Sequence, residues 1–144
     1  FSPDLFTSRA MIVTVLWRLS GSPVVNYYMP FADVDQASWY AEAVRWAASC
    51  GIVTGYDNGN FGPNDPITRE QLAAMLYRSA GSPEVTGSLS FSDAGETSPY
   101  AHDALLWAVQ KGILNGTDSG RIAPSANADR AQVAAMLARY LKNQ

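Results

Sequence analysis

Apolar residues recur every three or four positions in five segments of the chain, which is the spacing of one face of a helix. The clearest stripe contains Leu72, Met75 and Leu76. The pattern predicts helices over about 9–20, 39–50, 69–80, 99–111 and 130–141. Glycines at positions 51, 81 and 112 directly follow predicted segments, where helices commonly end. The sequence therefore predicts pairs of helices joined by turn-rich loops.

Polar residues at the starts of these segments support the same boundaries. Thr68 precedes one helix, and Gln71 three residues later completes a capping box. Ser38, Ser98 and Asp129 precede three other helices and are expected to cap them. Trp46 and Trp107 lie deep in the helical pattern and are expected in the core.

The chain repeats itself with a period of about sixty residues. Residues 61–83 align with residues 1–23 without a gap, and the same stretch recurs from Ile122. We therefore divide the chain into the second half of a first repeat (1–23), a second repeat (31–83) and a third (91–142). Repeats of this kind bury their apolar faces against their neighbours. Any function is then expected several times over, in grooves between copies.

Composition and charge exclude several classes of protein. The 144 residues are 47% hydrophobic and only 16% charged, which argues against disorder and a coiled coil. A net charge of −3 gives no support to nucleic-acid binding, which needs a basic face. No apolar run approaches the length of a membrane span, and no signal peptide is recognisable. The single Cys50 cannot form an internal disulfide and is expected to be buried, because it lies inside an apolar helical pattern.

An arginine directly follows the capping residue of three helices, at positions Arg9, Arg69 and Arg130. The helix macrodipole disfavours a cation there by roughly 0.3–1 kcal/mol, so its presence in all three copies needs a reason. One reason is an anion site, because the first turn of a helix offers free N–H groups and the guanidinium fits a carboxylate. The alternative is structural: each arginine pairs with an internal carboxylate such as Asp33 or Asp93, or stacks on an aromatic ring. Three further arginines, near the helix C-termini, are favoured by the dipole and suggest no function: Arg18, Arg78 and Arg139.

Two further pairs of residues recur beside these helices. Asp33 and Asp93 each stand two residues after a phenylalanine, a position more typical of a loop carboxylate than of a ligand contact. Trp39 and Tyr100 open the first helices of their repeats. Exposed rings there suit stacking on sugar faces, although a core or interface position is at least as compatible with the pattern.

The order of these segments in the second repeat resembles the S-layer homology (SLH) module. The segments that carry the resemblance are Phe31-Ala32-Asp33-Val34 and residues 39–44, 51–56 and 61–71. The family's Thr-Arg-Ala-Glu motif corresponds to residues 68–71, 129–132 and 8–11. Its glutamate is replaced by glutamine in the first two of these and by Met11 in the third. The resemblance covers nearly the whole chain, as two full modules and the second half of another.

The resemblance implies an all-α fold, a pseudo-threefold bundle of helix-loop-helix SLH repeats. It also implies a noncovalent anchor of a larger bacterial surface protein, located in the extracellular cell wall or S-layer. The ligand would be an acidic secondary cell-wall polysaccharide, possibly pyruvylated. By family analogy the motif arginines meet the acid group, while the aspartates and the helix-start aromatics line the same grooves. The ligand-binding residues implied are Arg9, Arg69, Arg130, Asp33, Asp93, Trp39 and Tyr100. We expect the groove built with Arg69, Asp33 and Trp39 to be the best of three unequal sites.

Two other classes of function compete with a wall anchor. An architectural or protein–protein interaction module would use the arginines only as internal partners. An enzyme is disfavoured, because one histidine (His102, expected on the surface) and one cysteine leave little material for nucleophilic catalysis. Residues 57–60 hint at a calcium loop but depart from the EF-hand spacing. The sequence therefore predicts no catalytic residue, no metal site and no cofactor.

Overall fold

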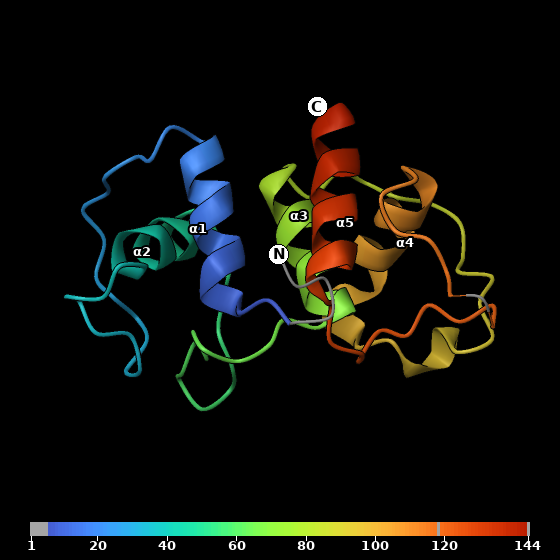
Figure 1. The fold of residues 1–144 in the computed structure, drawn as a ribbon, viewed down its shortest axis with the longest axis horizontal. Helices are drawn as coiled ribbons and strands as arrows, with labels where there is room; N and C mark the ends of the chain where they lie inside the picture. Colours follow the sequence, from blue (N-terminus) through green and yellow to red (C-terminus); the bar gives the residue numbers. More distant parts are fainter. Residues whose placement is uncertain (1–5, 118, 144) are drawn as a thin grey trace. The chain divides into compact units, whose positions relative to one another are not determined.

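The computed structural model describes residues 6–117 and 119–143, and this part of the chain is helical (Figure 1). The α-helices are α1 (Arg9–Leu19), α2 (Ala41–Ser49), α3 (Arg69–Ser79), α4 (His102–Gln110) and α5 (Arg130–Lys142). Two short 3-10 helices, η1 (Ala94–Glu96) and η2 (Pro99–Ala101), precede α4. The described residues form no strand, only isolated β-bridges. These observations confirm the all-α class, whereas the threefold symmetry of the repeats stays a prediction.

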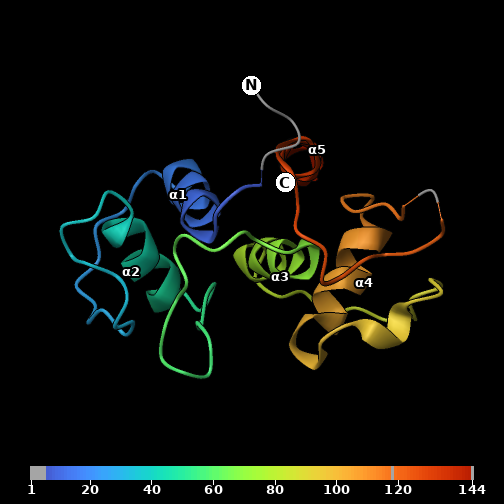
Figure 2. The same cartoon turned by 60° about the horizontal axis from the view of Figure 1, so that its bottom comes forward.

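The chain divides into two compact units. The N-terminal unit is residues 8–66, in which α1 packs against α2. The C-terminal unit is residues 67–144 together with the start of the chain, and in it α3 packs against α4. Both pairs lie side by side in the two views (Figures 1 and 2). Each unit therefore joins the second helix of one repeat to the first helix of the next.

Three helices begin with the caps that the sequence predicts. Thr68 and Gln71 form a complete capping box at α3, and a second box begins with Asp129 at α5. Ser8 caps α1 by accepting a hydrogen bond from the Met11 N–H at 3.2 Å. The methionine side chain cannot accept a bond in return, so α1 has only half of the box.

Of the two predicted serine caps, Ser38 is wrong, whereas Ser98 does occupy the N-cap position of η2, followed by proline, but without a side-chain capping bond. The hydroxyl of Ser38 donates to the carbonyl of Asp35 at 2.5 Å, and α2 begins only at Ala41. The hydroxyl of Ser98 donates to a carboxylate oxygen of Glu70 on α3 at 2.6 Å, rather than capping its own helix. A serine hydroxyl can donate to a nearby acceptor instead of accepting from the first turn of a helix, and both serines do so here.

Aliphatic side chains and the two predicted core tryptophans are buried. Trp46 is 7% exposed and Trp107 is 4% exposed. Each fully buried leucine contributes about 1.5–3 kcal/mol to folding. The largest buried aliphatic side chains are Ile12, Leu16, Ile67, Leu72, Leu76, Leu105, Ile113, Leu114 and Ile122.

Two minor expectations concern single polar residues. The prediction for Cys50 is wrong, because the thiol is exposed where α2 ends and the helical stripe no longer continues. His102 lies on the surface, as predicted. No helix in the described part of the chain is long and apolar enough to cross a membrane.

Candidate functional site

The motif arginine makes the same contact in both units. The Nε of Arg9 donates to the main-chain carbonyl of Phe61 at 2.9 Å, and the Nε of Arg69 donates to that of Ile122 at 2.9 Å. Phe61 and Ile122 are equivalent positions in successive repeats. A carbonyl acceptor offsets the unfavourable position of a cation at a helix start. The arginine therefore has a structural role: it links the second helix of one repeat to the loop of the next.

The aspartate of the Phe-x-Asp segment holds the same loop through its N–H groups. The two carboxylate oxygens of Asp33 accept hydrogen bonds from the N–H groups of Phe61 and Gly62, each at 2.8 Å. Asp93 accepts two equivalent bonds of 2.8 Å from residues 122–123. Each loop is thus fixed by an aspartate through its N–H groups and by an arginine through a carbonyl. Both aspartates are loop carboxylates, the role that their spacing suggested.

These contacts differ from the expected pairing. The sequence predicts that Arg69 shares a groove with Asp33 and Trp39. The structure instead brings Arg9 together with Asp33 in the N-terminal unit, and Arg69 with Asp93 in the C-terminal unit. The arginine that begins the second helix of one repeat binds the loop of the following repeat. The arginine and the aspartate that hold the same loop therefore belong to different sequence repeats.

Burial and hydrogen bonding shift the pKa of Asp93 in opposite directions. The residue is 2% exposed. Burial disfavours the charged carboxylate, but the N–H groups of Ile122 and Ala123 and the charge of Arg121 outweigh it. The result is a lowered pKa for Asp93. Arg121 also contacts Glu96 at 3.0 Å, so an exposed ion-pair cluster lies at the edge of this loop.

The phenylalanine of the same segment packs under a glycine of each loop. A Cβ atom on Gly55 would lie 2.4 Å from the ring of Phe31, and one on Gly116 would lie 2.4 Å from the ring of Phe91. Contacts this short do not occur in folded proteins, so no side chain fits at either position. The Phe-x-Asp segment therefore shapes the loop with its ring and fixes it with its carboxylate.

The guanidinium of Arg9 is enclosed by aromatic rings. Its Cζ lies 4.8 Å from the centroid of the Tyr56 ring and 4.8 Å from that of Phe61. Arg9 is only 5% exposed. These distances are those of cation–π contacts, which the structural alternative predicted. The side chain of Arg9 therefore acts mainly in packing.

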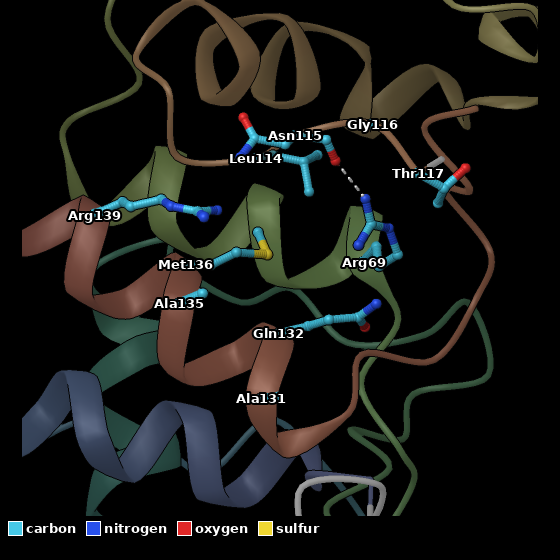
Figure 3. A pocket seen from close by; sticks show the side chains of 10 residues that line it. All are labelled: Arg69, Leu114, Asn115, Gly116, Thr117, Ala131, Gln132, Ala135, Met136 and Arg139. Atoms are coloured by element: carbon cyan, nitrogen blue, oxygen red, sulfur yellow. Dashed lines mark hydrogen bonds between the residues drawn. The ribbon is translucent and has the colours of Figure 1, made fainter. Parts of the chain in front are cut away.

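The guanidinium of Arg69 lies beside a cavity of about 320 Å³ in the C-terminal unit (Figure 3). Its Nε and Nη2 donate to the carbonyls of Ile122 and Asn115, each at 2.9 Å. The remaining amino group, Nη1, has no hydrogen-bond partner among the described residues. Burial lowers the pKa of Arg69, and the charges of Asp129 and Asp93 oppose that shift. An arginine nonetheless keeps its charge at neutral pH.

The cavity combines two cations with apolar and amide groups. Arg139 lies at the end opposite Arg69, with Met136 and Leu114 between them (Figure 3). The Nη1 of Arg139 donates to the carbonyl of Ile113 at 3.3 Å, a long bond that uses only part of the guanidinium. The lining residues are Arg69, Leu114, Asn115, Gly116, Thr117, Ala131, Gln132, Ala135, Met136 and Arg139.

Sequence reasoning missed most of this lining. The helix dipole alone accounts for an arginine at position 139, so the sequence suggests no function for Arg139. The spacing of Gln132, Met136 and Arg139 puts them on one face of α5, and that spacing was the available signal. The loop residues 114–117 follow a helix-ending glycine in a segment that recurs at 53–56, but nothing in their chemistry marked them as a lining.

The two predicted aromatics are exposed and do not line this cavity. Trp39 is 63% exposed, and its ring meets that of Tyr40 edge-on at 5.1 Å. Tyr100 is 52% exposed, with the guanidinium of Arg78 5.9 Å from its ring centroid. Their roles as sugar contacts stay predictions.

Arg130 differs from the other two motif arginines. The side chain is half-buried, and its Nε makes no hydrogen bond with any described residue. It begins α5, whose capping box is complete. In the described part of the chain, Arg130 thus has no counterpart of the carbonyls of Phe61 and Ile122 that accept from Arg9 and Arg69.

The chemistry of the cavity suits anion binding. No group of three or more histidine, cysteine, aspartate or glutamate side chains in the described ranges is placed to hold a metal ion. The cavity instead presents guanidinium and amide donors above an apolar floor. Together with the fold, this defines a helical repeat module with a cationic pocket where successive repeats meet.

Comparison with known families identifies the class of module. The family model described as "S-layer homology domain" matches residues 30–73 and 90–134. The chain therefore belongs to the S-layer homology domain family. Membership confirms the expected family and a location at the extracellular cell surface.

Curated relatives carry similar sequences within much longer chains. The chain is 34% identical over 142 residues to an amylopullulanase of Thermoanaerobacterium thermosulfurigenes, covering 95% of this chain and 8% of that protein. It is 31% identical over 150 residues to a surface-layer 125 kDa protein of Lysinibacillus sphaericus, covering 99% and 12%. It is 25% identical over 149 residues to a cellulosome-anchoring protein of Acetivibrio thermocellus, covering 99% and 33%. The chain thus spans from about a twelfth to a third of these relatives, and those named as enzymes match it over only a small share of their length.

Proposed function

We propose that this chain anchors a larger surface protein to the bacterial cell wall by binding an acidic, possibly pyruvylated, secondary wall polysaccharide. The observation that carries the proposal is the cavity beside Arg69, where Nη1 has no described partner and a second cation, Arg139, stands at the far end. A volume of about 320 Å³ is at the lower end of ligand-site sizes and fits a small sugar unit. The names of the anchoring and surface-layer relatives point the same way.

A carboxylate in this cavity would complete the hydrogen bonds of Arg69. A charge-assisted hydrogen bond contributes about 1.5–3 kcal/mol, so one such site binds weakly. A polysaccharide repeats its acid group along the chain, and several weak contacts on one polymer raise the overall affinity. Arg9 and Arg130, with Asp33, Asp93, Trp39 and Tyr100, are proposed as weaker or supporting contacts.

The test compares walls that retain or lack their acidic polymers, together with pyruvylated and unmodified saccharides in solution. Arg69→Met removes the charge while keeping much of the side-chain volume, and we expect it to weaken binding roughly tenfold or more. The matched control is Arg18→Met, because Arg18 is an exposed arginine near a helix C-terminus outside the cavity. Undiminished binding to stripped walls would contradict the proposal.

The architectural alternative rests on the enclosure of Arg9 between two rings. If the motif arginines act only in packing, Arg69→Met should lower the melting temperature and leave wall binding unchanged. Measuring both quantities on the same variant separates the two functions.

A further inference from the structure

The side-chain amide of Gln132 has a fixed orientation. In the capping box of α5, the backbone N–H of Asp129 donates to the Oε1 of Gln132 at 3.1 Å. An N–H group donates only to an acceptor, so this bond identifies which end of the amide is the oxygen. The amide nitrogen, Nε2, is then on the side that the cap does not use. The cap therefore sets the direction of an NH₂ group.

That NH₂ group lies at the cavity beside Arg69 (Figure 3). Figure 3 shows the amide nitrogen of Gln132 directed toward the guanidinium of Arg69. The described hydrogen bonds of the two side chains use Nε and Nη2 of the arginine and Oε1 of the glutamine, so Nη1 and Nε2 have no described partner. Arg69 is only 5% exposed, and polar groups on so buried a side chain normally have a partner. Two donors thus face the same space without a described acceptor between them.

The nearest carboxylates do not supply that acceptor. The charges of Asp129 and Asp93 act on Arg69. Asp129, however, accepts from the N–H of Gln132 at 2.8 Å, and Asp93 accepts from the N–H groups of residues 122–123. Neither aspartate lines the cavity, and none of the described residues that do so is acidic. An oxygen atom of a bound ligand is therefore the acceptor that suits both donors.

The amide at position 132 changes the charge of this cavity without changing the helix start. A glutamate, which the SLH motif has at this position, accepts the same bond from the Asp129 N–H and completes the same cap. Its second oxygen would occupy the place of Nε2 and put a negative charge opposite Arg69. Glutamine removes that charge and adds a donor. Residue 132 therefore decides whether the cavity attracts or repels an acid group.

We propose that Gln132 is a specificity-determining residue, whose Nε2 binds one carboxylate of the wall polymer together with the Nη1 of Arg69. Each carboxylate oxygen accepts from one donor, so the acid group is held in one orientation. The remainder of the sugar unit then lies over Met136 and Leu114, toward Arg139 (Figure 3). A carboxamide has only one oxygen to offer the two donors, so the cavity discriminates against the neutral form of the same polymer. This inference rests on the proposed function, because it names the group that the same cavity selects.

The experiment changes the charge of the cavity and keeps the cap. Gln132→Glu retains the oxygen that accepts from Asp129, and an acidic residue is favoured near a helix N-terminus, so the melting temperature should not fall. We expect this variant to bind acidic wall polymer roughly tenfold or more weakly, because a donor is replaced by a negative charge. The matched control is Gln71→Glu, which adds the same charge to the equivalent capping box of α3, outside the cavity. Its binding should stay nearly unchanged.

The probe is wall polymer with its carboxyl groups either free or converted to amides, titrated by calorimetry. The unchanged chain should prefer the acidic form, and Gln132→Glu should lose most of that preference. Equal weakening by Gln132→Glu and Gln71→Glu overturns the inference, because general charge repulsion would then explain both. Full binding by Gln132→Glu, with binding weakened in Arg69→Met, also overturns it and leaves the proposed function standing. Full binding by both Gln132→Glu and Arg69→Met overturns the inference and the proposed function together.

Discussion

Arg9 and Arg69 occupy the same motif position in successive repeats but have different surroundings. Both arginines are 5% exposed, and both bind a loop carbonyl at 2.9 Å. Around Arg9 the rings of Tyr56 and Phe61 cover the guanidinium. The equivalent positions beside Arg69 are Thr117 and Ile122, and a cavity lies on that side.

The comparison shows that the shared motif links a helix start to a loop, while the residues around it decide whether a cavity remains beside the guanidinium. The hydrogen bonds to the loop are the same in both copies, so they report packing rather than ligand recognition. A small residue at position 117 leaves a donor of Arg69 facing the cavity, whereas a tyrosine at position 56 encloses Arg9. Arg9 and Arg69 therefore share one structural role, while only Arg69 lies beside a cavity.

The largest expected effect separates the two loop carboxylates. Asp93→Asn should lower the melting temperature by about 8 °C, because the amide replaces one of two acceptors with a donor that faces a buried N–H. Asp33→Asn should lower it by about half as much, since Asp33 is exposed and water can compensate. Differential scanning calorimetry checks both. Equal losses would show that burial does not distinguish the two loops.

The acid sensitivity of the C-terminal unit follows from the same carboxylate. Because the folded chain lowers the pKa of Asp93 below its usual value near 4, the ionised group stabilises the fold above about pH 4. That contribution is lost as the pH falls through the lowered pKa. Urea unfolding from pH 6 to pH 2 should show a loss of stability that is smaller in Asp93→Asn. If the free energy of unfolding of Asp93→Asn falls by the same amount as that of the unchanged chain between pH 6 and pH 2, Asp93 is not the source of the acid sensitivity.

Glu70 distinguishes the second repeat from the other two, which have alanine at positions 10 and 131. Its carboxylate accepts from the N–H and hydroxyl of Ser98 at 3.0 and 2.6 Å. Glu70→Ala leaves both donors without a partner and should cost about 2 kcal/mol in urea unfolding. Ser98→Ala, which removes only the hydroxyl, is the milder control. The idea fails if Glu70→Ala is neutral.

Exchanging Thr117 beside Arg69 and Tyr56 beside Arg9 tests whether these neighbours cause the difference between the two sites. Thr117→Tyr places a ring beside Arg69 and should reduce polymer binding roughly tenfold while changing stability by no more than about 1 kcal/mol. The reciprocal Tyr56→Thr should leave polymer binding at the Arg69 cavity intact. Titration of both variants with wall polymer, after a melting check, measures the effect. Unchanged binding by a folded Thr117→Tyr chain would exclude the cavity as the site.

The smallest expected effect concerns the caps. Met11→Gln gives α1 the reciprocal capping bond that α3 has, and should stabilise the chain by about 0.5 kcal/mol. Gln71→Met should remove a similar amount from α3. Chemical denaturation of the two variants is the measurement, and a change of the opposite sign in either one would show that the box does not limit helix stability here.

Local features of the chain were predictable because they depend on neighbours in sequence. The spacing of Leu72, Met75 and Leu76 fixes one helix face, and Thr68 with Gln71 fixes its start. The loop role of Asp33 also followed from its position after Phe31. The hydroxyls of Ser38 and Ser98 do not cap their helices, because a serine hydroxyl has several acceptors within reach and only the fold determines which one it contacts.

By itself the sequence determined the helices, the repeat, the family and the positions of the motif arginines, since each depends on residues within about one repeat. Only the tertiary structure decided the partner of each arginine, because the acceptor of Arg9 lies 52 residues away and that of Arg69 lies 53 residues away. It also decided that Arg139 lines a cavity, because that depends on how distant segments of the C-terminal unit pack.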